Sequence, residues 1–281
     1  MKNKQLVSII IRTCNRPDIL KNALKSIEKQ TYTNLEVIVV EDGKNLSKEM
    51  IKQKFPNLNI KYFSTQNKVG RTKAGNIGLS LASGDYFNFL DDDDILLPNH
   101  VETLVSNLLE NNTYKAVYSI AMEYQIRVYS KTPYKFKVKR KFIRYQQEYH
   151  KLVLFHHNYI PIQSIMFHKE LYQKYGGFDE RLSVLEDWDL WIRYSLHTQF
   201  LFVPIKTSIY YTPYKSKEKI ERDKLLHIYR RQLLEKFKNY ELKIDVSELN
   251  KELNYIYNYQ NQRNLLYWIK KIILFILYKD I

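Results

Sequence analysis

Four short apolar runs, separated by amphipathic stretches, organise the first part of the chain. Each run is nearly continuous in apolar character, which is typical of strands that are buried on both faces of a sheet. Apolar runs that alternate with amphipathic stretches indicate βα units. The sequence therefore predicts an open α/β fold with a mostly parallel sheet flanked by helices, and its first four strands are Leu6 to Ile11, Leu35 to Val40, Ile60 to Phe63 and Tyr86 to Leu90.

Three stretches between and after these runs carry helix signals. Residues 17–29 begin with a proline, which suits the first turn of a helix. Residues 72–82 carry a second apolar stripe, and a further helix is predicted from Pro98 onward because apolar residues recur there at helical spacing.

The pattern changes in the second half of the chain. Residues 123–159 are rich in Lys, Arg and Tyr and fit no single periodicity, so they are predicted to form either a mobile flap or a β-ribbon. Helical spacing returns at 185–195, and the chain beyond Tyr214 is predicted to be helical to its end. A domain boundary is therefore expected at Tyr214, followed by a helical C-terminal extension of residues 215–281.

Charge, cysteine content and hydropathy limit the class of protein. The 281 residues include 45 Lys and Arg against 30 Asp and Glu, a net charge of +15 that favours an anionic partner such as nucleic acid, an acidic membrane surface or a phosphorylated substrate. The single cysteine, Cys14, excludes an internal disulfide and is typical of a reducing compartment. No apolar run reaches the roughly 18 residues of a spanning helix. The stretch from Leu6 to Ile11 lacks a cleavage site, so it is interpreted as a strand and not as a signal peptide.

Four consecutive aspartates, Asp91 to Asp94, directly follow the fourth predicted strand. Like charges this close oppose folding unless positive charge lies among them. Polar residues also follow the first two strands, namely Thr13 and Asn15 after the first and Asp42 after the second. Because parallel sheets bind ligands at the carboxyl ends of their strands, the sequence predicts one acidic crevice at this edge.

The aspartate cluster suits a hard divalent cation. Mg²⁺ and Mn²⁺ take one or two carboxylates while substrate phosphates and water fill the other positions. In an extended chain Asp91 and Asp93 would share one side and Asp92 would face the other. The alternative is helix capping, because Asp is common before a first helical turn, but four in succession favour the metal.

The other polar residues have structural alternatives of their own. Asp42 precedes Gly43 and fits a turn as well as a ligand contact. Thr13 and Asn15 fit helix capping. Arg71 begins a predicted helix and fits either a diphosphate contact or a solvated surface.

Three segments taken together resemble the family 2 glycosyltransferases, which have a GT-A fold. They are VSIIIRTCNRPDILKNALKSIEKQTYTNLEVIVVEDG, ASGDYFNFLDDDDILLP and GGFDERLSVLEDWDLWIR. The resemblance implies a Rossmann-like catalytic domain of residues 1–214, with a nucleotide-sugar half of about residues 1–97 and an acceptor half of about residues 98–214. It also implies an inverting, metal-assisted transfer of a sugar from a nucleotide sugar.

The resemblance assigns roles to the donor-side residues. In the family the carboxylates of a DXD motif hold a divalent metal on the diphosphate, and by position Asp93 resembles the direct ligand of Mn²⁺ or Mg²⁺. Asp91 and Asp92 would lie nearest the ribose, the metal shell or the sugar. The nucleotide contacts implied at the other strand ends are Thr13 and Asn15 with the base and ribose, Asp42 with the uracil or ribose, and Arg71 near the nucleotide.

The GGFDE loop and the residues after it resemble the acceptor-side signature of the family. Asp187 is implied to be the catalytic base, with Glu186 and Trp188 on the acceptor side. The alternative for Glu186 and Asp187 is an acidic first turn of a helix, with an ion pair between Asp189 and Arg193. For Trp188 the alternative is a core anchor.

One segment departs from the family pattern. Many members carry a Tyr-Arg-x-His motif after the next strand, where the His assists the metal or diphosphate, but residues 210–214 read YYTPY. No His metal ligand is therefore predicted. His156 and His157 lie in an aromatic segment and are expected to be structural or to line the acceptor site.

These residues suit one reaction. An inverting transfer needs one base for the acceptor hydroxyl and a cation for the charge on the departing diphosphate. The predicted function is transfer from a nucleotide sugar, UDP-linked by preference, to a glycan or lipid-linked acceptor in polysaccharide biosynthesis. The alternatives are a non-catalytic nucleotide-binding or glycan-binding adaptor and a nucleotidyltransferase. A nucleic-acid partner is not predicted, because no such motif occurs and the crevice is acidic.

Two further segments suggest contact with a membrane surface. The apolar residues 264–281 contain lysines and fit a helix in the membrane interface, although docking on the catalytic domain or pairing in a homodimer would fit as well. We therefore predict a cytoplasmic protein with peripheral contact to the inner face of the cell membrane. A basic segment could meet a phosphate-bearing lipid carrier, an anionic glycan or the membrane through Lys135, Lys137, Lys139, Arg140, Lys141 and Arg144.

Overall fold

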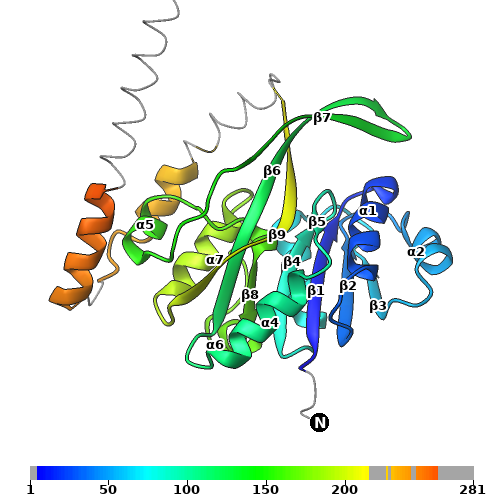
Figure 1. Cartoon of the computed structure of the whole chain (residues 1–281). Coiled ribbons are helices and arrows are strands. Elements are labelled where there is room, and N and C mark those ends of the chain that lie inside the picture. The colour runs from blue at the N-terminus through cyan, green and yellow to red at the C-terminus, as the bar shows by residue number, and fades with distance from the viewer. Residues whose placement is uncertain (1–4, 215–225, 227–228, 242–244, 259–281) are drawn as a thin grey trace, which may run out of the picture.

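A nine-stranded sheet with helices on both faces forms the frame of the protein (Figure 1). The computed structural model describes residues 5–214, 226, 229–241 and 245–258. The strands are β1 (Val7–Thr13), β2 (Leu35–Glu41), β3 (Ile60–Ser64), β4 (Tyr86–Asp91), β5 (Ile95–Leu96), β6 (Ala116–Lys131), β7 (Tyr134–Ile143), β8 (Ile165–His168) and β9 (Phe200–Pro213). The helices are α1 (Pro17–Glu28), α2 (Lys48–Lys54), α3 (Arg71–Leu81), α4 (His100–Glu110), α5 (Lys151–His156), α6 (Lys169–Tyr175) and α7 (Glu186–Ser195).

The strand order explains where a ligand site can form. The order is β3-β2-β1-β4-β8-β6-β9-β5, with β7 paired to β6. Strands β3, β2, β1 and β4 are parallel, whereas β8 is antiparallel to both β4 and β6. The carboxyl ends of β1, β2 and β4 therefore share one edge, as the four apolar runs predicted.

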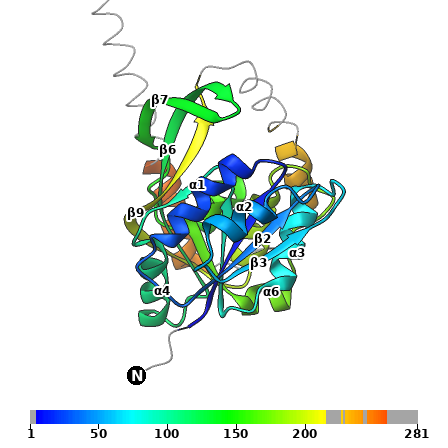
Figure 2. The ribbon, with the colours of Figure 1, turned by 90° about the vertical axis from the view of Figure 1, so that its right-hand side faces the viewer.

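Two hydrophobic cores, one on each face of the sheet, fix the position of the strands. All seven residues of β1 are buried, and successive side chains enter opposite cores because the side-chain period of a strand is two. Ile10 packs in the core that includes residues of α3, α6 and α7. Ile9 and Ile11 pack in the core that includes residues of α1, α2 and α4. Figure 2 shows the sheet between these two groups of helices.

The predicted helices are present with small differences in their bounds. The helix predicted from Pro98 begins at His100, after Asn99 at its N-cap position. The helix predicted at 72–82 begins at Arg71. Helix α2 was not predicted, because seven residues are too few to give a clear period.

The segment with no clear periodicity is a β-ribbon. Strands β6 and β7 pair in antiparallel register from Met122–Ile143 to Lys131–Tyr134 and project beyond the rest of the sheet (Figure 1). The β-ribbon prediction is confirmed for this part of residues 123–159. Irregular pairing at two bulges in β6 and β7 weakens the strict alternation that the sequence would otherwise show.

Part of the chain beyond Tyr214 packs on the rest of the protein. Residues 229–236 and 246–258 are helical. Leu233 and Phe237 are buried in the same core as α7, and the Phe237 ring lies 6.0 Å from that of Phe155. The segment 264–281 lies outside the described residues. None of the helices in the described ranges has the length and apolar character that crossing a bilayer requires.

Candidate active site

The ends of β1 and β2 form one wall of the site. Thr13 is paired in register with Glu41 at the last position of both strands. Asn15 has a positive φ of 54° and lies against Gly43, where an added Cβ would be 3.0 Å from the Asn15 Oδ1 atom. Gly43 has a φ of +140°, so both the space and the backbone favour glycine there. The exposed Asn15 is thus held at the rim of the site.

The four aspartates form a turn and not a continuation of β4. The strand ends at Asp91, and the Asp94 amide donates a hydrogen bond to the Asp91 carbonyl at 3.0 Å. Arg16 contacts both Asp92 and Asp93, the latter at 3.5 Å. Asp92 is fully buried, whereas the side chains of Asp91 and Asp93 are 27% and 42% exposed, so the predicted difference between Asp92 and its two neighbours is compatible with this turn.

Two arginines supply positive charge among these carboxylates. The buried Arg12 guanidinium lies 2.7 Å from Asp91 and 2.9 Å from Glu186. It also lies 5.4 Å from the centre of the Phe178 ring, which covers one of its faces. Burial lowers the pKa of Arg12, but the two carboxylates outweigh it and raise the pKa above its ordinary value. Arg12 therefore links the end of β4 to the start of α7.

The arginines do not remove all the repulsion in the turn. Burial, opposed by Arg16 and reinforced by Asp93, raises the pKa of Asp92 to about 7. Burial and then the charge of Asp91 also raise the pKa of Asp93. Additional positive charge would stabilise these ionised carboxylates.

The residues of the turn fit a divalent cation that a ligand helps to hold. The Asp93 side chain is 42% exposed, so its oxygens can reach a ligand. Within the described residues no three His, Cys, Asp or Glu side chains converge as a complete metal site. Mg²⁺ and Mn²⁺ accept one or two carboxylates from the protein when phosphates and water complete the shell.

Asp94 has a structural role in this fold. Its carboxylate is nearly buried and accepts a hydrogen bond from the Tyr211 amide of β9 at 3.3 Å. Burial and then the charge of Asp93 raise the pKa of Asp94 well above its ordinary value. Asp94 thus joins the aspartate turn to β9.

Asp42 fastens the loop that leads into α3. Its carboxylate accepts hydrogen bonds from the backbone amides of Val69 at 2.6 Å and Gly70 at 3.0 Å, and only 4% of the residue is exposed. This places Arg71, the first residue of α3, 3.6 Å from Glu186 with its side chain 55% exposed. Asp42 therefore helps to position the Arg71 guanidinium at the crevice. A direct contact between Asp42 and a nucleotide stays a prediction.

Asp187 lies at the N-terminus of α7, beside the Arg12 network. Its Oδ2 atom accepts a hydrogen bond from the Asn158 side chain at 3.0 Å, and its Oδ1 atom accepts one from the Trp188 amide at 2.8 Å. Burial and then the charge of Glu186 raise the pKa of Asp187 to about 6. A carboxylate with such a pKa can accept a proton near neutral pH.

Both neighbours of Asp187 are buried. Glu186 is 3% exposed and pairs with Arg12, and its place on the acceptor side stays a prediction. Trp188 is 2% exposed and donates a hydrogen bond from its indole to the Leu154 carbonyl at 2.6 Å. Trp188 is therefore a core anchor, because its ring and its polar atom are both satisfied within the protein.

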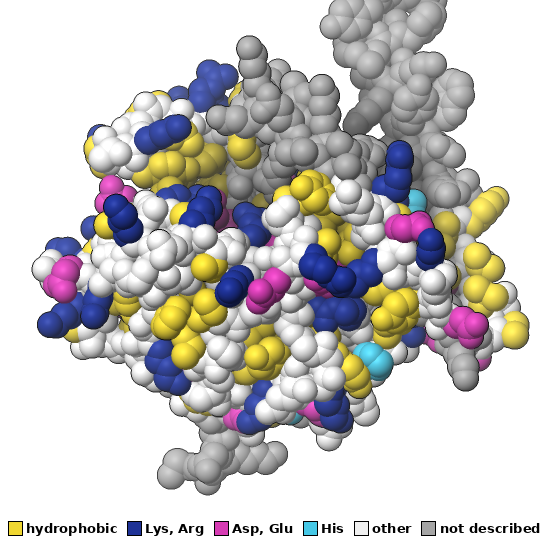
Figure 3. Space-filling model, turned by 180° about the vertical axis from the view of Figure 1, so that it is seen from behind, with side chains coloured by type: hydrophobic (Ala, Val, Ile, Leu, Met, Phe, Trp, Pro, Cys, Tyr) yellow, Lys and Arg dark blue, Asp and Glu magenta, His cyan; other side chains and the backbone are white. Residues whose placement is uncertain are grey.

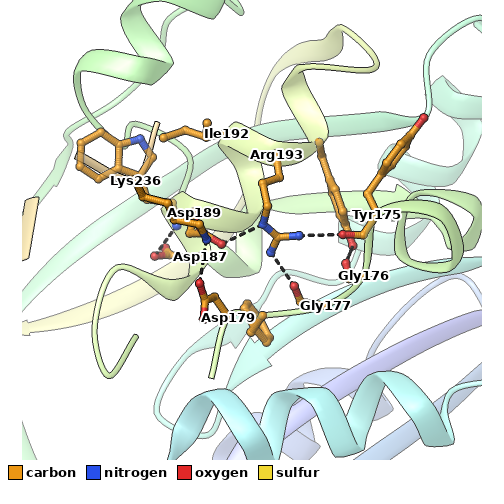
Figure 4. Close-up of polar contacts among 12 residues, drawn as sticks. Tyr175, Gly176, Gly177, Asp179, Asp187, Asp189, Ile192, Arg193 and Lys236 are labelled. Atoms are coloured by element: carbon orange, nitrogen blue, oxygen red, sulfur yellow. Dashed lines mark hydrogen bonds and ion pairs between the residues drawn. The ribbon is translucent and has the colours of Figure 1, made fainter. Parts of the chain in front are cut away.

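A second polar network anchors α7 through Asp189 and Arg193 (Figure 4). The predicted pair between Asp189 and Arg193 is present at 2.9 Å, and Arg193 also donates to the Tyr175 carbonyl at 2.8 Å. Lys236 lies 2.5 Å from Asp189 and 2.8 Å from Asp179 of the GGFDE loop. The C-terminal extension thus helps to hold the helix that carries Asp187.

The segment in place of the Tyr-Arg-x-His motif has an internal partner. The Tyr210 hydroxyl and the Thr212 hydroxyl donate hydrogen bonds to Glu123 at 2.9 and 2.7 Å. His156 accepts a hydrogen bond on its carbonyl from Arg230 at 2.8 Å.

Sequence reasoning missed three residues of the site. Arg12 and Arg16 flank the end of β1, and Asn158 lies far from Asp187 in the chain. The sequence could have indicated the two arginines. Four adjacent aspartates require nearby positive charge, and RTCNR, residues 12–16, follows a predicted strand that ends at the same edge of the sheet. No sequence signal could have paired Asn158 with Asp187.

The chain is similar in sequence to known glycosyltransferases. The family described as glycosyl transferase family 2 matches residues 8–176. The chain is 31% identical over 204 residues to the uncharacterized glycosyltransferase YwdF of Bacillus subtilis, which covers 73% of each protein. Matches to two similar relatives from Rickettsia cover 58% of the length of those proteins.

Two further proteins are informative. The chain is 35% identical over 107 residues to the UDP-Glc:alpha-D-GlcNAc-diphosphoundecaprenol beta-1,3-glucosyltransferase WfgD of Escherichia coli, a match that covers 38% of this chain and 42% of that one. The structure of the mannosyltransferase PcManGT from Pyrobaculum calidifontis, in complex with GDP-Man and Mn²⁺, superposes with a TM-score of 0.64 at 14% identity. That superposition covers 90% of this chain and 69% of the other and shows a shared fold.

Proposed function

The chain belongs to glycosyl transferase family 2 and has the GT-A fold, and from this premise we propose that it transfers a sugar from a UDP-sugar to a lipid-linked acceptor. The observation that carries the proposal is the Arg12 network, which joins the aspartate turn to the helix bearing Asp187. A donor-binding group and a base are thus held at one edge of the sheet. The relative WfgD, whose name specifies UDP-Glc and a diphosphoundecaprenol acceptor, supports the choice of donor and acceptor.

The donor would lie across the ends of β1, β2 and β4. We assign Asn15 and Arg71 to direct contact with the nucleotide, since both are exposed at the crevice. Thr13 and Asp42 act through other groups, because the Thr13 hydroxyl donates to Asp92 at 2.6 Å and Asp42 holds the loop before α3. This division keeps all four residues on the donor side.

The metal site is assigned to Asp93, with Asp91 and Asp92 behind it. Charge that builds on the departing diphosphate would be balanced by Mn²⁺ or Mg²⁺ held at Asp93. Arg12 fixes the Asp91 carboxylate, and Arg16 with Thr13 fixes that of Asp92. These contacts keep the turn rigid, which a preorganised site requires.

Asp187 is assigned as the base of an inverting transfer. It would accept the proton of the acceptor hydroxyl while that oxygen forms a bond to the anomeric carbon and the bond to the diphosphate breaks. Asn158 orients the carboxylate through its hydrogen bond to Oδ2. One carboxylate is enough, unlike in glycosidases, which use two.

Transfer is expected to depend on pH through Asp187. Its pKa of about 6 lies above the ordinary value of an aspartate, and only the ionised form accepts a proton. With donor and Mn²⁺ at saturation, so that bound positive charge keeps Asp92 ionised, kcat/KM for the acceptor should be constant above the pKa of Asp187 and fall tenfold per pH unit below it. Rates measured across this range with a fixed donor would check this, together with circular dichroism to show that the protein stays folded. A limb near the ordinary value of an aspartate would contradict the assignment.

A panel of nucleotide sugars tests the proposed function. The full chain is incubated with each donor, a short-chain lipid diphosphate acceptor and Mn²⁺, Mg²⁺ or a chelator, and products are resolved by mass spectrometry. Asp93→Asn should weaken metal-dependent donor binding about tenfold to a hundredfold, because diphosphate and water supply the other ligands. Asp18→Asn, an exposed aspartate on α1, is the matched control and should not change binding.

Other products would point to other functions. Release of pyrophosphate would indicate nucleotidyl transfer, and donor binding without turnover would indicate an adaptor. Equal donor affinity of Asp93→Asn and wild type in Mn²⁺ would contradict the metal assignment.

We place this transfer at the inner face of the cell membrane, where a lipid-linked acceptor and a cytoplasmic nucleotide sugar can meet. The predicted contributions of residues 264–281 to membrane contact or to a homodimer concern a segment outside the described residues. The basic residues 135–144, by contrast, belong to the ribbon of β6 and β7, whose structure is described.

A further inference from the structure

The ribbon of β6 and β7 carries a one-sided excess of positive charge. Residues 124–144 contain no Asp or Glu. Only Arg144, at the base of the ribbon, forms an ion pair with a described residue, Glu123. The basic residues of this stretch are Arg127, Lys131, Lys135, Lys137, Lys139, Arg140, Lys141 and Arg144.

Strand pairing gathers several of these charges on one face of the ribbon. Arg127 lies directly opposite Lys137, and Arg140 lies opposite Gln125. Directly opposite residues of an antiparallel pair project from the same face, and like charges in such a pair are destabilising. Lys135, Lys137 and Lys139 are all exposed, and we call them the ribbon lysines. Among the residues that the structure places, no carboxylate pairs with the ribbon lysines, so an anionic partner would offset their repulsion.

The opposite face of the ribbon fastens it to the catalytic domain. The ring of Phe136 lies 5.1 Å from that of Tyr211 in β9, and Tyr124 lies 6.0 Å from the same ring. Phe136 and Tyr211 also line a cavity of about 480 Å³ that reaches Asp93. The ribbon lysines are therefore displayed on a supported strand beside the site. Figure 3 shows Lys and Arg side chains on the projecting ribbon above a band of hydrophobic side chains.

We propose that this basic face docks the protein on the surface of an anionic lipid bilayer. Each Lys or Arg near such a surface contributes about 1 kcal/mol of attraction. Near the turn of the ribbon, Tyr129 is 68% exposed, and an aromatic ring beside lysines suits the interface of a membrane. The choice of a bilayer over another polyanion rests in part on the proposed lipid-linked acceptor, which is confined to a membrane.

Vesicle flotation of the full chain tests the docking surface. Wild type should float with phosphatidylcholine vesicles that contain phosphatidylglycerol and stay in solution with phosphatidylcholine alone. The triple variant K135Q, K137Q, K139Q should lose about a hundredfold in partition to the anionic vesicles. The control K48Q, K52Q, K54Q removes the same number of exposed charges from α2 and should partition like wild type.

Several outcomes would overturn the proposal. The first is an equal loss of vesicle binding in both triple variants, which would show that only net charge matters. The second is equal flotation of wild type with neutral and anionic vesicles. The third is retention of wild type on RNA or heparin without flotation on vesicles. Transfer to a water-soluble acceptor measures the proposed function separately. The ribbon variant should retain that activity, so a protein that floats without transferring sugar would refute the function and leave the docking surface intact.

Discussion

Asp187→Asn is expected to lower kcat for sugar transfer roughly a thousandfold, with the affinity for the nucleotide sugar changed by less than about twofold. The amide keeps the size of the side chain, and its oxygen can still accept the hydrogen bond from the Trp188 amide, although its NH2 group cannot accept the one from Asn158. It cannot accept the proton of the acceptor hydroxyl. The loss should therefore appear in the chemical step, which single-turnover transfer together with calorimetric donor binding would measure.

The same helix offers a control for this variant. Asp189→Asn weakens the ion pairs with Arg193 and Lys236 on the far side of α7. It should lower the melting temperature, because Asp189 is fully buried, while kcat falls less than about tenfold. If Asp187→Asn and Asp189→Asn lose activity equally, Asp187 has a structural role and the base lies elsewhere. Residual activity of Asp187→Asn should also lack the pH limb near 6.

Arg12→Met is expected to lower the free energy of unfolding by about 3–5 kcal/mol. Met has similar length but leaves the carboxylates of Asp91 and Glu186 without their shared cation. Burial would raise the pKa of Asp91, but Arg12 outweighs it and lowers that pKa below its ordinary value, so the ionised carboxylate depends on the guanidinium. Urea unfolding of each variant at neutral pH would measure the loss.

Two further variants separate charge from geometry at this position. Arg12→Lys keeps the charge but cannot reach both carboxylates in the same planar arrangement, so it should recover only part of the stability. Adding Glu186→Gln to Arg12→Met should recover stability as well, because one unpaired charge is removed. An Arg12→Met protein as stable as wild type would show that the network contributes little.

Much of the fold followed from local patterns. The nearly continuous apolar runs gave the parallel strands, since a strand buried on both faces must be apolar throughout, and all seven positions of β1 are indeed buried. For residues 123–159 the sequence predicts either a mobile flap or a β-ribbon and does not decide between them. The bulges of the ribbon disturb the alternation, and its pairing partner can be recognised only in three dimensions.

Individual site residues divide in the same way. The sequence predicts roles for Asp93 and Asp187 because each lies in a dense, ordered motif beside a predicted element, and both roles stay proposals. The sequence does not show which of Glu186 and Asp187 faces the crevice. In the structure Glu186 points toward Arg12, whereas Asp187 is partly exposed. Adjacent residues of a helix point in different directions, and only the packing of that helix decides which one faces the crevice.

By itself the sequence determined a parallel α/β frame and an acidic edge, because these depend on short-range periodicity and on the polar residues after each apolar run. The family and its GT-A fold came from the resemblance of motifs that are contiguous in the chain. Tertiary structure alone decided which charges balance the acidic edge. Arg12 meets Glu186 across 174 positions of sequence, and Lys236 reaches back from the C-terminal extension to α7. Coulombic interactions act through distance in space, and distance in space is set by the packing of the whole sheet.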